Sequence, residues 1–146
     1  MVVSHSETTR ATPAEVWRWY ADTSRWPRWD GGVRSVDLAG RFASGTRGTV
    51  LLPNGRRARL RLRDVVEPER FTDVVKLRGI TVITAHHVLP EGPFTRVTHD
   101  VRLGGLLGRL FPHLIAAPVR RTLPATVAHL AFLAARDAAA DERPLA

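Results

Sequence analysis

The sequence predicts an α+β fold in which an antiparallel sheet packs against one long C-terminal helix. Beyond residue 33 the chain is a series of short segments separated by turns rich in Gly and Pro, a pattern typical of antiparallel strands. Between Ala117 and Asp141, apolar residues at steps of three and four would form one stripe of a helix. They are Val119, Leu123, Val127, Leu130 and Ala134. A single apolar helix after many strands needs a sheet to pack against.

The N-terminal part is predicted to be one strand, Val3–Thr9, followed by two short helices. Thr12-Pro13-Ala14-Glu15 supplies a Thr N-cap, a Pro at the first helical position and a Glu at the third, which together form a capping box. The apolar side of this helix would carry Val16, Trp19 and Tyr20. Asp22-Thr23-Ser24 ends the helix and can cap a second one that contains Trp26-Pro27-Arg28-Trp29.

Six further strands are predicted between residues 33 and 103. They are Val33–Leu38, Thr49–Leu52, Arg57–Arg63, Phe71–Leu77, Ile80–Leu89 and Thr95–Leu103. The third is the clearest, because Arg and apolar residues alternate strictly, which in a strand places every Arg on one face. We expect this face of Arg57, Arg59, Arg61 and Arg63 to be solvated, and a polyanion-binding face is the alternative.

Prolines divide the C-terminal third of the chain. Leu106 to Phe111 predicts an apolar helical segment that Pro112 interrupts before the long helix. Pro118 fits the first turn of the long helix, where the first N–H groups have no partner. Pro124 lies inside the apolar stripe, removes a helical hydrogen bond and is expected to kink the helix.

Length and composition indicate one globular domain over residues 1–146, with a polar tail at about 141–146. The absence of cysteine excludes disulfides, thiolate catalysis and cysteine-based zinc sites. The N-terminus lacks the pattern of a signal peptide, and no apolar run approaches the roughly 20 residues of a membrane-spanning helix. We therefore expect a cytoplasmic protein.

The net charge of +8 comes almost entirely from arginine, with Lys76 as the single lysine. Because these arginines are spread along the chain, a solvated surface is favoured over a polyanion-binding face. The Arg row at residues 57–63 also lacks the interleaved aromatic residues on which nucleic-acid bases stack. No specific nucleic acid is expected as a partner.

Several motifs resemble the START-like (SRPBCC) superfamily, which includes Bet v 1 and the bacterial polyketide cyclase/dehydrase-like proteins. Ala11-Thr12-Pro13-Ala14-Glu15-Val16-Trp17, then Asp22, then Trp26-Pro27-Arg28-Trp29 is similar to the opening of the bacterial branch. Asp64–Phe71 resembles the link between two middle strands, and Thr95-Arg96-Val97-Thr98-His99 resembles the last strand. The resemblance covers roughly the whole chain. Its motifs are mostly caps, turns and core residues, so they identify the fold better than the activity.

This resemblance implies a helix-grip fold, a curved antiparallel sheet of about seven strands around the C-terminal helix with a hydrophobic cavity between them. It also implies that the cavity binds lipids, polyketides or other apolar small molecules. Some members of the superfamily close polyketide rings, and others act without catalysis. The prolines at 112, 118 and 124 depart from the family pattern. They would either change how tightly the helix covers the cavity or adjust the helix to the curvature of the sheet.

Two residues are candidates for acid–base catalysis. The predicted inner face of the last strand is apolar except for His99, and a buried neutral imidazole can exchange a proton near neutral pH. Glu7 is the candidate partner, provided that the first strand turns His5 and Glu7 toward the cavity. An aldol-type ring closure needs a base for an acidic C–H and a donor for the developing enolate. The alternative is that His99 is a core histidine bonded to a backbone group or water.

Candidate ligand contacts come from the expected inner faces of the sheet and helices. They are His5, Trp19, Tyr20, Leu60, His86, Val97, Val101, Phe111, Ile115, Val119 and Leu123. His86 and His87 are adjacent on a strand and point to opposite faces, so they cannot both ligate one metal ion. No metal and no other cofactor is expected.

The sequence is compatible with three functions. The first is binding of an apolar or aromatic small molecule between sheet and helix, with acid–base-assisted cyclisation or dehydration. The second is a noncatalytic carrier or sensor of a hydrophobic ligand, which a closed cavity without convergent polar groups would favour. The third is an interaction module whose basic sheet face contacts a polyanion or an acidic protein.

Overall fold

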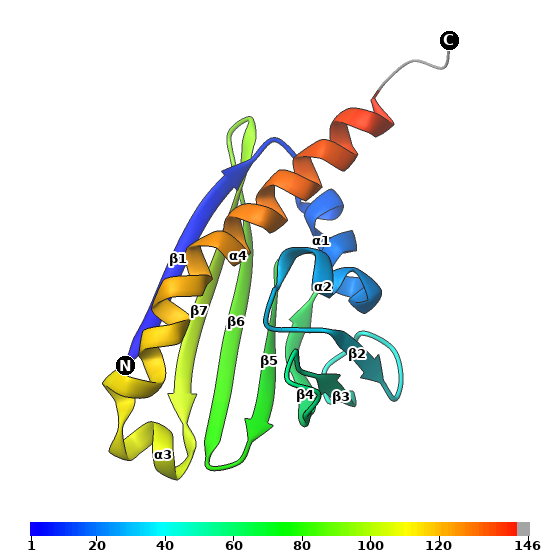
Figure 1. Cartoon of the computed structure of the whole chain (residues 1–146). Coiled ribbons are helices and arrows are strands. Elements are labelled where there is room, and N and C mark those ends of the chain that lie inside the picture. Colours follow the sequence, from blue (N-terminus) through cyan, green and yellow to red (C-terminus); the bar gives the residue numbers. More distant parts are fainter. Residues whose placement is uncertain (143–146) are drawn as a thin grey trace.

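The computed structural model describes residues 1–142 and contains one seven-stranded sheet crossed by a long helix (Figure 1). The strands are β1 (Val2–Thr9), β2 (Ser35–Leu38), β3 (Arg47–Leu51), β4 (Arg57–Val66), β5 (Arg70–Leu77), β6 (Ile80–Glu91) and β7 (Phe94–Gly104). Their order is β1-β7-β6-β5-β4-β3-β2, and every neighbouring pair is antiparallel. The predicted α+β helix-grip fold is confirmed.

Helices cover the inner face of this sheet. They are α1 (Pro13–Ala21), the 3-10 turn η1 (Thr23–Arg25), α2 (Trp26–Trp29), α3 (Gly105–Leu110) and α4 (Pro112–Asp141). The predicted capping box begins α1, since Thr12 Oγ1 accepts from the Glu15 N–H and Glu15 Oε1 accepts from the Thr12 N–H. Within the described part of the chain, no helix is both long and apolar enough to cross a membrane.

The terminal helix α4 differs from its predicted start. It begins at Pro112 and not near Ala117, so Pro118 lies inside the helix and its predicted first-turn position is wrong. Pro112 occupies the first turn instead, where the missing N–H costs no hydrogen bond. Pro118 and Pro124 are both exposed, and water can bond the carbonyl groups that they leave free on the outer side of the helix. The predicted polar tail lies largely outside the described residues.

Strand β6 is two residues longer than predicted. It continues through Pro90 to Glu91, opposite Thr95 and Phe94 of β7. The pairing of β5 with β6 ends at His87, so one edge of β6 has no paired strand at Pro90. Proline is tolerated at such an edge, because its missing N–H breaks no sheet hydrogen bond there.

The two faces of the sheet differ as the alternation in β4 predicts. Ala58, Leu60 and Leu62 are buried, whereas the four arginines of the row are exposed. On the inner face, aromatic rings from α1, α2 and β5 fill the end of the sheet next to α1. They are Trp17, Tyr20, Trp26, Trp29 and Phe71. This packing leaves the remaining part of the inner face to α4.

Hydrogen bonds to the backbone hold the helices in place above the sheet. Trp26 Nε1 donates to the carbonyl of Tyr20 at 2.8 Å, which ties α2 to α1. Thr9 Oγ1 of β1 donates to the carbonyl of Ala131 in α4 at 2.9 Å. Both bonds are buried, where leaving a polar group unpaired would cost about 1–3 kcal/mol.

Candidate functional site

A cavity of about 260 Å³ lies between the inner face of the sheet and α4. Its apolar wall is formed by β5, β6 and β7 on one side and by α4 on the other. Representative residues of this wall are Val75, Leu77, Val82, Val101, Val119 and Leu123. Thr122 and Thr126 of α4 add hydroxyl groups on the helix side.

Four ionisable side chains also line this apolar cavity: Asp30, Asp73, His86 and His99. The last three come from the neighbouring strands β5, β6 and β7. The antiparallel register places His86 directly opposite His99, and their ring centroids are 4.4 Å apart. The carboxylate of Asp73 lies 3.5 Å from Nε2 of His86. Asp30 follows α2, and its carboxylate accepts a hydrogen bond from the Gly32 N–H. The sheet register therefore gathers the polar groups at one place.

Tyr20 of α1 reaches this group from the aromatic core. Its hydroxyl lies 2.8 Å from Nε2 of His99, and both side chains are buried. Burial raises the pKa of Tyr20 well above its ordinary value, and the nearby Asp73 adds to this effect. The hydroxyl thus keeps its proton at neutral pH. It satisfies a histidine nitrogen that would otherwise be buried without a partner.

Burial also shifts the pKa values of the cavity residues, in each case toward the uncharged form. Loss of solvation raises the pKa of Asp73 to about 8, with a further contribution from the charge of Asp30. The pKa of Asp30 is itself raised by burial, although the Gly32 N–H opposes this. Burial lowers the pKa of His99 to about 3. The pKa of Asp73 therefore lies much closer to neutral pH than that of His99.

His86 contacts both Phe71 and His99. Its ring stacks on Phe71 with centroids 4.0 Å apart. Burial, and then the proximity of His99, holds its pKa well below the ordinary range. Its Nδ1 atom is buried and makes no hydrogen bond with any described residue. At neutral pH both histidines are uncharged, and Asp73 is largely protonated.

Five of the sequence-predicted residues lie on the cavity wall: His86, His99, Val101, Val119 and Leu123. His99 faces inward as expected, with 1% of its surface exposed. Tyr20 contacts the site through its bond to His99. The structure thus brings these side chains together, and their role in binding or catalysis stays a prediction.

The other predicted residues lie away from the cavity wall. Phe111 is 51% exposed at the start of α4, and Ile115 is half-buried one turn later. Leu60 and Val97 are buried in the sheet outside the cavity. Trp19 is buried, and the guanidinium groups of Arg25 and Arg28 each lie 4.8 Å from its ring centroid. Periodicity shows which face a side chain occupies, but not how far along the sheet the cavity extends.

Glu7, the expected partner of His99, is engaged elsewhere. Its Oε1 lies 2.8 Å from Nε2 of His5, and both side chains are partly exposed on β1. Glu7 and Phe132 share a separate shallow groove between β1 and α4. Because β1 is the edge strand, the side chains on its inner face meet the margin of the helix and solvent.

Sequence reasoning missed the two carboxyl groups of the cavity. In β5, Phe71, Asp73, Val75 and Leu77 alternate onto one apolar face, the same signal that singled out His99. That signal could have found Asp73. Asp30 stands before two glycines and has the pattern of a turn residue. Nothing local distinguishes it, because only the placement of α2 brings it to the cavity.

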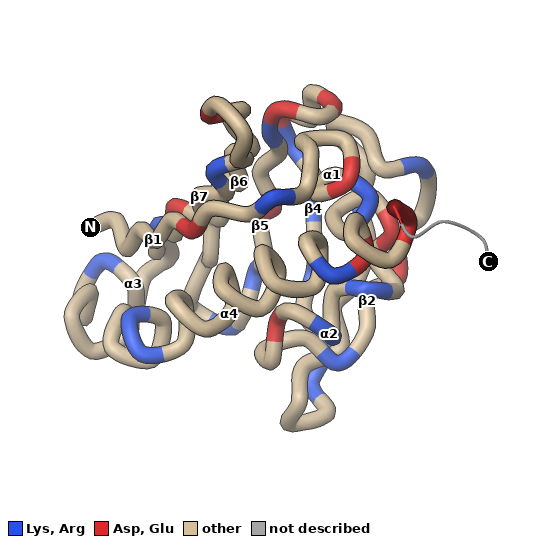
Figure 2. The backbone as a smooth tube through the Cα atoms, turned by 90° about the horizontal axis from the view of Figure 1, so that it is seen from above, with Lys and Arg blue, Asp and Glu red and all other residues tan. Residues whose placement is uncertain are grey.

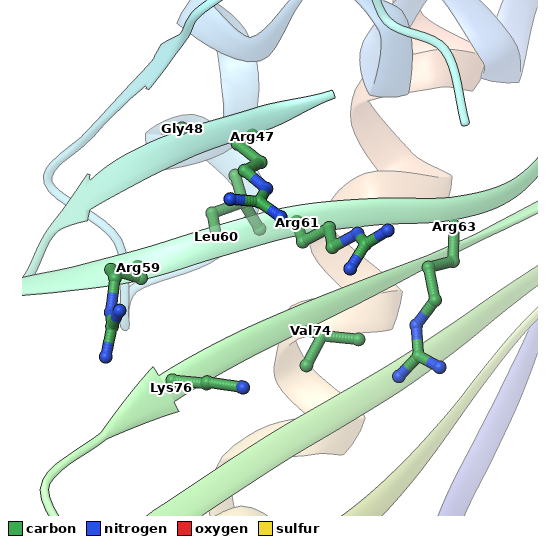
Figure 3. Close-up of a pocket in the computed structure, with 8 residues that line it drawn as sticks. All are labelled: Arg47, Gly48, Arg59, Leu60, Arg61, Arg63, Val74 and Lys76. Atoms are coloured by element: carbon green, nitrogen blue, oxygen red, sulfur yellow. The ribbon is translucent and has the colours of Figure 1, made fainter. Parts of the chain in front are cut away.

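A second hollow, of about 560 Å³, lies on the outer face of the sheet (Figure 3). Five cations surround it: Arg47, Arg59, Arg61, Arg63 and Lys76. Arg47 pairs directly with Arg61 across β3 and β4, and Arg59 pairs with Lys76 across β4 and β5. Such like-charged cross-strand pairs are unfavourable. Among residues 1–142, no carboxylate lies within 4.0 Å of these five side chains.

Known structures share this architecture. The protein TTHA0849 from Thermus thermophilus is 18% identical over 94% of this chain and 99% of its own, with a TM-score of 0.71. Ara h 8.0201 is 11% identical over 92% and 97% of the two chains, with a TM-score of 0.72. Norcoclaurine synthase from Thalictrum flavum is 14% identical over 91% and 85%, with a TM-score of 0.64. These likenesses establish the fold.

Among curated proteins, none matches the sequence. Residues 1–134 match the family described as "polyketide cyclase / dehydrase and lipid transport". This match spans every strand and most of α4. The chain therefore belongs to the polyketide cyclase/dehydrase and lipid transport family of START-like proteins.

Proposed function

We propose that this protein binds a small apolar or aromatic carbonyl compound in the cavity and transfers protons to and from it through Asp73. One observation carries the proposal: a carboxyl group with a pKa of about 8 forms part of the wall of an otherwise apolar cavity. A general acid or base works best when its pKa lies near the operating pH. Asp73 meets this condition better than His99, whose pKa of about 3 makes it a weak base.

The size of the cavity limits the ligand. A volume of about 260 Å³ corresponds to roughly nine water molecules at the volume that each occupies in the liquid. A ligand with on the order of ten non-hydrogen atoms, such as a bicyclic aromatic compound, fits this space. The neutral forms of Asp73, His86 and His99 suit such a ligand, because a buried charge on any of them would oppose the entry of an apolar molecule.

The proposed chemistry is the removal of an acidic proton next to a carbonyl group. Ionised Asp73 takes the proton from carbon, and the electron pair of that C–H bond moves to the carbonyl oxygen. Thr122 and Thr126 line the same cavity, and their hydroxyls donate to the carbonyls of Pro118 and Thr122. Either hydroxyl would have to turn away from that carbonyl to donate to the resulting enolate oxygen. Return of a proton from Asp73 to carbon completes an exchange, whereas attack of the enolate on a second carbonyl closes a ring.

The experiment is proton exchange of 2-tetralone, a bicyclic ketone, followed by NMR in D₂O. We expect exchange at the carbon next to the carbonyl to accelerate with the protein present. The rate should rise with pH through a midpoint near 8 and fall to the background rate in Asp73→Asn. Asp37→Asn, an exposed carboxyl on β2, is the matched control and should retain the wild-type rate.

A noncatalytic carrier is the second candidate. Its support is the apolar wall of the cavity together with the family, whose description includes lipid transport. Binding of 2-tetralone to wild type without accelerated exchange would favour this function. Native mass spectrometry of protein purified from its expression host tests both candidates, since each expects a small molecule to be retained in the cavity.

The basic outer face supports a third candidate, the binding of a polyanion. The observation in its favour is the pair of like-charged cross-strand contacts around the outer hollow, which an anion would relieve. Heparin is a suitable probe, and its binding should weaken as salt is added. Arg59→Gln with Arg61→Gln should weaken this binding further, whereas Arg10→Gln with Arg18→Gln is the charge-matched control outside the hollow.

A further inference from the structure

The end of the molecule that carries α3 exposes a cluster of large apolar side chains. This end patch consists of Leu106, Leu107, Leu110, Phe111 and Leu114. Leu106 is 68% exposed and Leu114 is 71% exposed. The five residues lie within nine positions of the chain, from 106 to 114. Isolated exposed apolar residues are common, but a contiguous patch of this kind marks an interaction surface.

The local structure explains why the end patch points outward. The N–H of Leu107 donates to the carbonyl of Gly79 at 2.8 Å, and Gly108 is buried against Leu103. Gly79 has a φ of +75°, and a Cβ built there would lie 2.9 Å from the Leu107 side chain. The inner side of α3 is thus seated tightly on the turn between β5 and β6. Its remaining side chains have nowhere to pack within the described residues.

The surroundings of the end patch are basic. Residues 101–136 contain five arginines and no Asp or Glu. Figure 2 shows basic segments and no acidic ones around α3 and the first turns of α4. Arg109 belongs to α3 itself, and Arg121 lies seven residues beyond Leu114, on the same face of α4. Arg120 contacts the sulfur of Met1, another exposed apolar residue.

We infer that the end patch docks the protein on the surface of a bilayer that contains anionic lipid. Apolar side chains on a short helix can enter the headgroup region, while neighbouring arginines bind the acidic headgroups. A second copy of this chain is a poorer occupant. A two-fold interface would bring identical patches together, so the arginines of one copy would face those of the other.

The position of the end patch links docking to the cavity. Leu107 packs on Gly79, and Leu77 and Val82 on either side of that turn line the cavity. Val119, on the opposite wall, follows Leu114 by little more than one helical turn. A docked protein therefore holds this end of the cavity next to the lipid, and an apolar ligand can pass between them with little exposure to water. This consequence for ligand exchange rests on the proposed function; docking does not.

Sedimentation of the ligand-free protein with vesicles tests the inference. We expect binding to phosphatidylglycerol-rich vesicles that weakens with salt, and much weaker binding to pure phosphatidylcholine. Leu106→Gln with Leu114→Gln should reduce the partition constant by about tenfold or more. Arg109→Gln with Arg121→Gln should reduce binding to phosphatidylglycerol and remove much of its salt dependence.

Matched controls isolate the end patch. Leu89→Gln with Phe132→Gln removes two apolar side chains elsewhere, which are 58% and 64% exposed, and should leave vesicle binding unchanged. Arg59→Gln with Arg61→Gln removes two cations of the basic outer face and should likewise leave vesicle binding unchanged. If the Leu106 and Leu114 variant binds vesicles as wild type does, docking through this patch is overturned. Docking on lipid is also overturned if this variant loses a dimer that wild type forms in gel filtration, because the patch would then bind a second copy. It is likewise overturned if this variant loses binding to an acidic polypeptide.

Failure of docking and failure of the proposed catalysis can be told apart. Asp73→Asn leaves the end patch intact and should bind vesicles normally while losing ketone exchange. The Leu106 and Leu114 variant leaves the cavity residues intact and should exchange 2-tetralone in detergent-free solution at the wild-type rate. Circular dichroism of each variant serves as the test of whether it is folded.

Discussion

The hydroxyl of Tyr20 lies 2.8 Å from Nε2 of His99, and 79 positions of sequence separate the two residues. This bond joins α1 to β7 at the boundary between the aromatic core and the cavity. On one side, the ring of Tyr20 packs edge-on against Trp17, Trp29 and Phe71. On the other side, His99 lines the cavity beside His86. The bond therefore joins the polar end of the cavity to the aromatic core.

Removing the hydroxyl with Tyr20→Phe should lower the free energy of unfolding by about 1–3 kcal/mol, because His99 Nε2 is left buried without a partner. Urea denaturation followed by tryptophan fluorescence measures this loss. In a His99→Phe background the same change should cost much less, since no polar nitrogen is then left unpaired. Equal losses in both backgrounds would mean that the hydrogen bond does not contribute.

Asp73 predicts how stability depends on pH. Its pKa is raised from 3.8 to about 8 in the folded protein, so the folded state binds one more proton than the unfolded state between these values. Stability is therefore greatest below the unfolded pKa and is lost as pH rises toward 8. The two cavity histidines have lowered pKa values. Below about pH 6.5 they therefore make the stability of the fold increase as pH rises, which is opposite to the effect of Asp73.

The Asp73→Asn variant tests the predicted loss of stability as pH rises toward 8. Between pH 6.5 and 8 wild type should lose on the order of 1 kcal/mol of stability per pH unit, and the variant should lose far less. Urea denaturation at several pH values gives both slopes. Asp37→Asn, an exposed carboxyl, is the control and should follow wild type. Parallel slopes for Asp73→Asn and wild type would show that Asp73 is ionised throughout, paired with a protonated His86.

The capping box of α1 predicts a stability change that is independent of the cavity. Thr12→Ala removes the acceptor for the Glu15 N–H and should cost about 0.5–2 kcal/mol. Thr12→Ser keeps a hydroxyl at the N-cap and should cost little. Thermal denaturation of the three proteins measures the difference. The prediction fails if Ala and Ser at this position give the same melting temperature.

Filling the cavity should weaken ligand binding without unfolding the protein. Val119→Phe places a larger side chain on the α4 wall, where the open volume is about 260 Å³. We expect an affinity for 2-tetralone at least about tenfold weaker, because the lost volume is a large part of the site. Calorimetry gives the affinity. Ala125→Phe, on the exposed side of the same helix, should bind the ketone as wild type does.

Sequence and structure agree best where the controlling interactions are local. Thr12 and Glu15 lie within one turn of each other, so the capping box could be predicted from the residues alone. The alternation of Arg57 to Arg63 predicted both faces of β4. The inward position of His99 followed in the same way, because a strand alternates its side chains whatever its partners are.

The misplaced predictions share a different cause. The sequence pattern predicts Pro118 in a first turn, although Pro112 begins α4 and the helix continues through Pro118 on its solvent side. The pattern predicts Phe111 and Ile115 in the cavity, although Phe111 belongs to the exposed end patch and Ile115 follows the patch directly. In each case the deciding factor is where a helix starts and how far it lies along the sheet. Neither quantity is set by the residues of the helix alone.

The order of the elements, the caps, the two faces of the strands and the family resemblance can therefore be predicted from the residues alone, since each depends on residues that are neighbours in the chain. Which polar groups share the cavity depends on how the strands and helices pack. Asp73, His86 and His99 meet because the antiparallel register sets three strands side by side, and Asp30 joins them because α2 packs there. Register and helix placement come from contacts between residues far apart in sequence, and these contacts make Asp73 the proposed proton-transfer group.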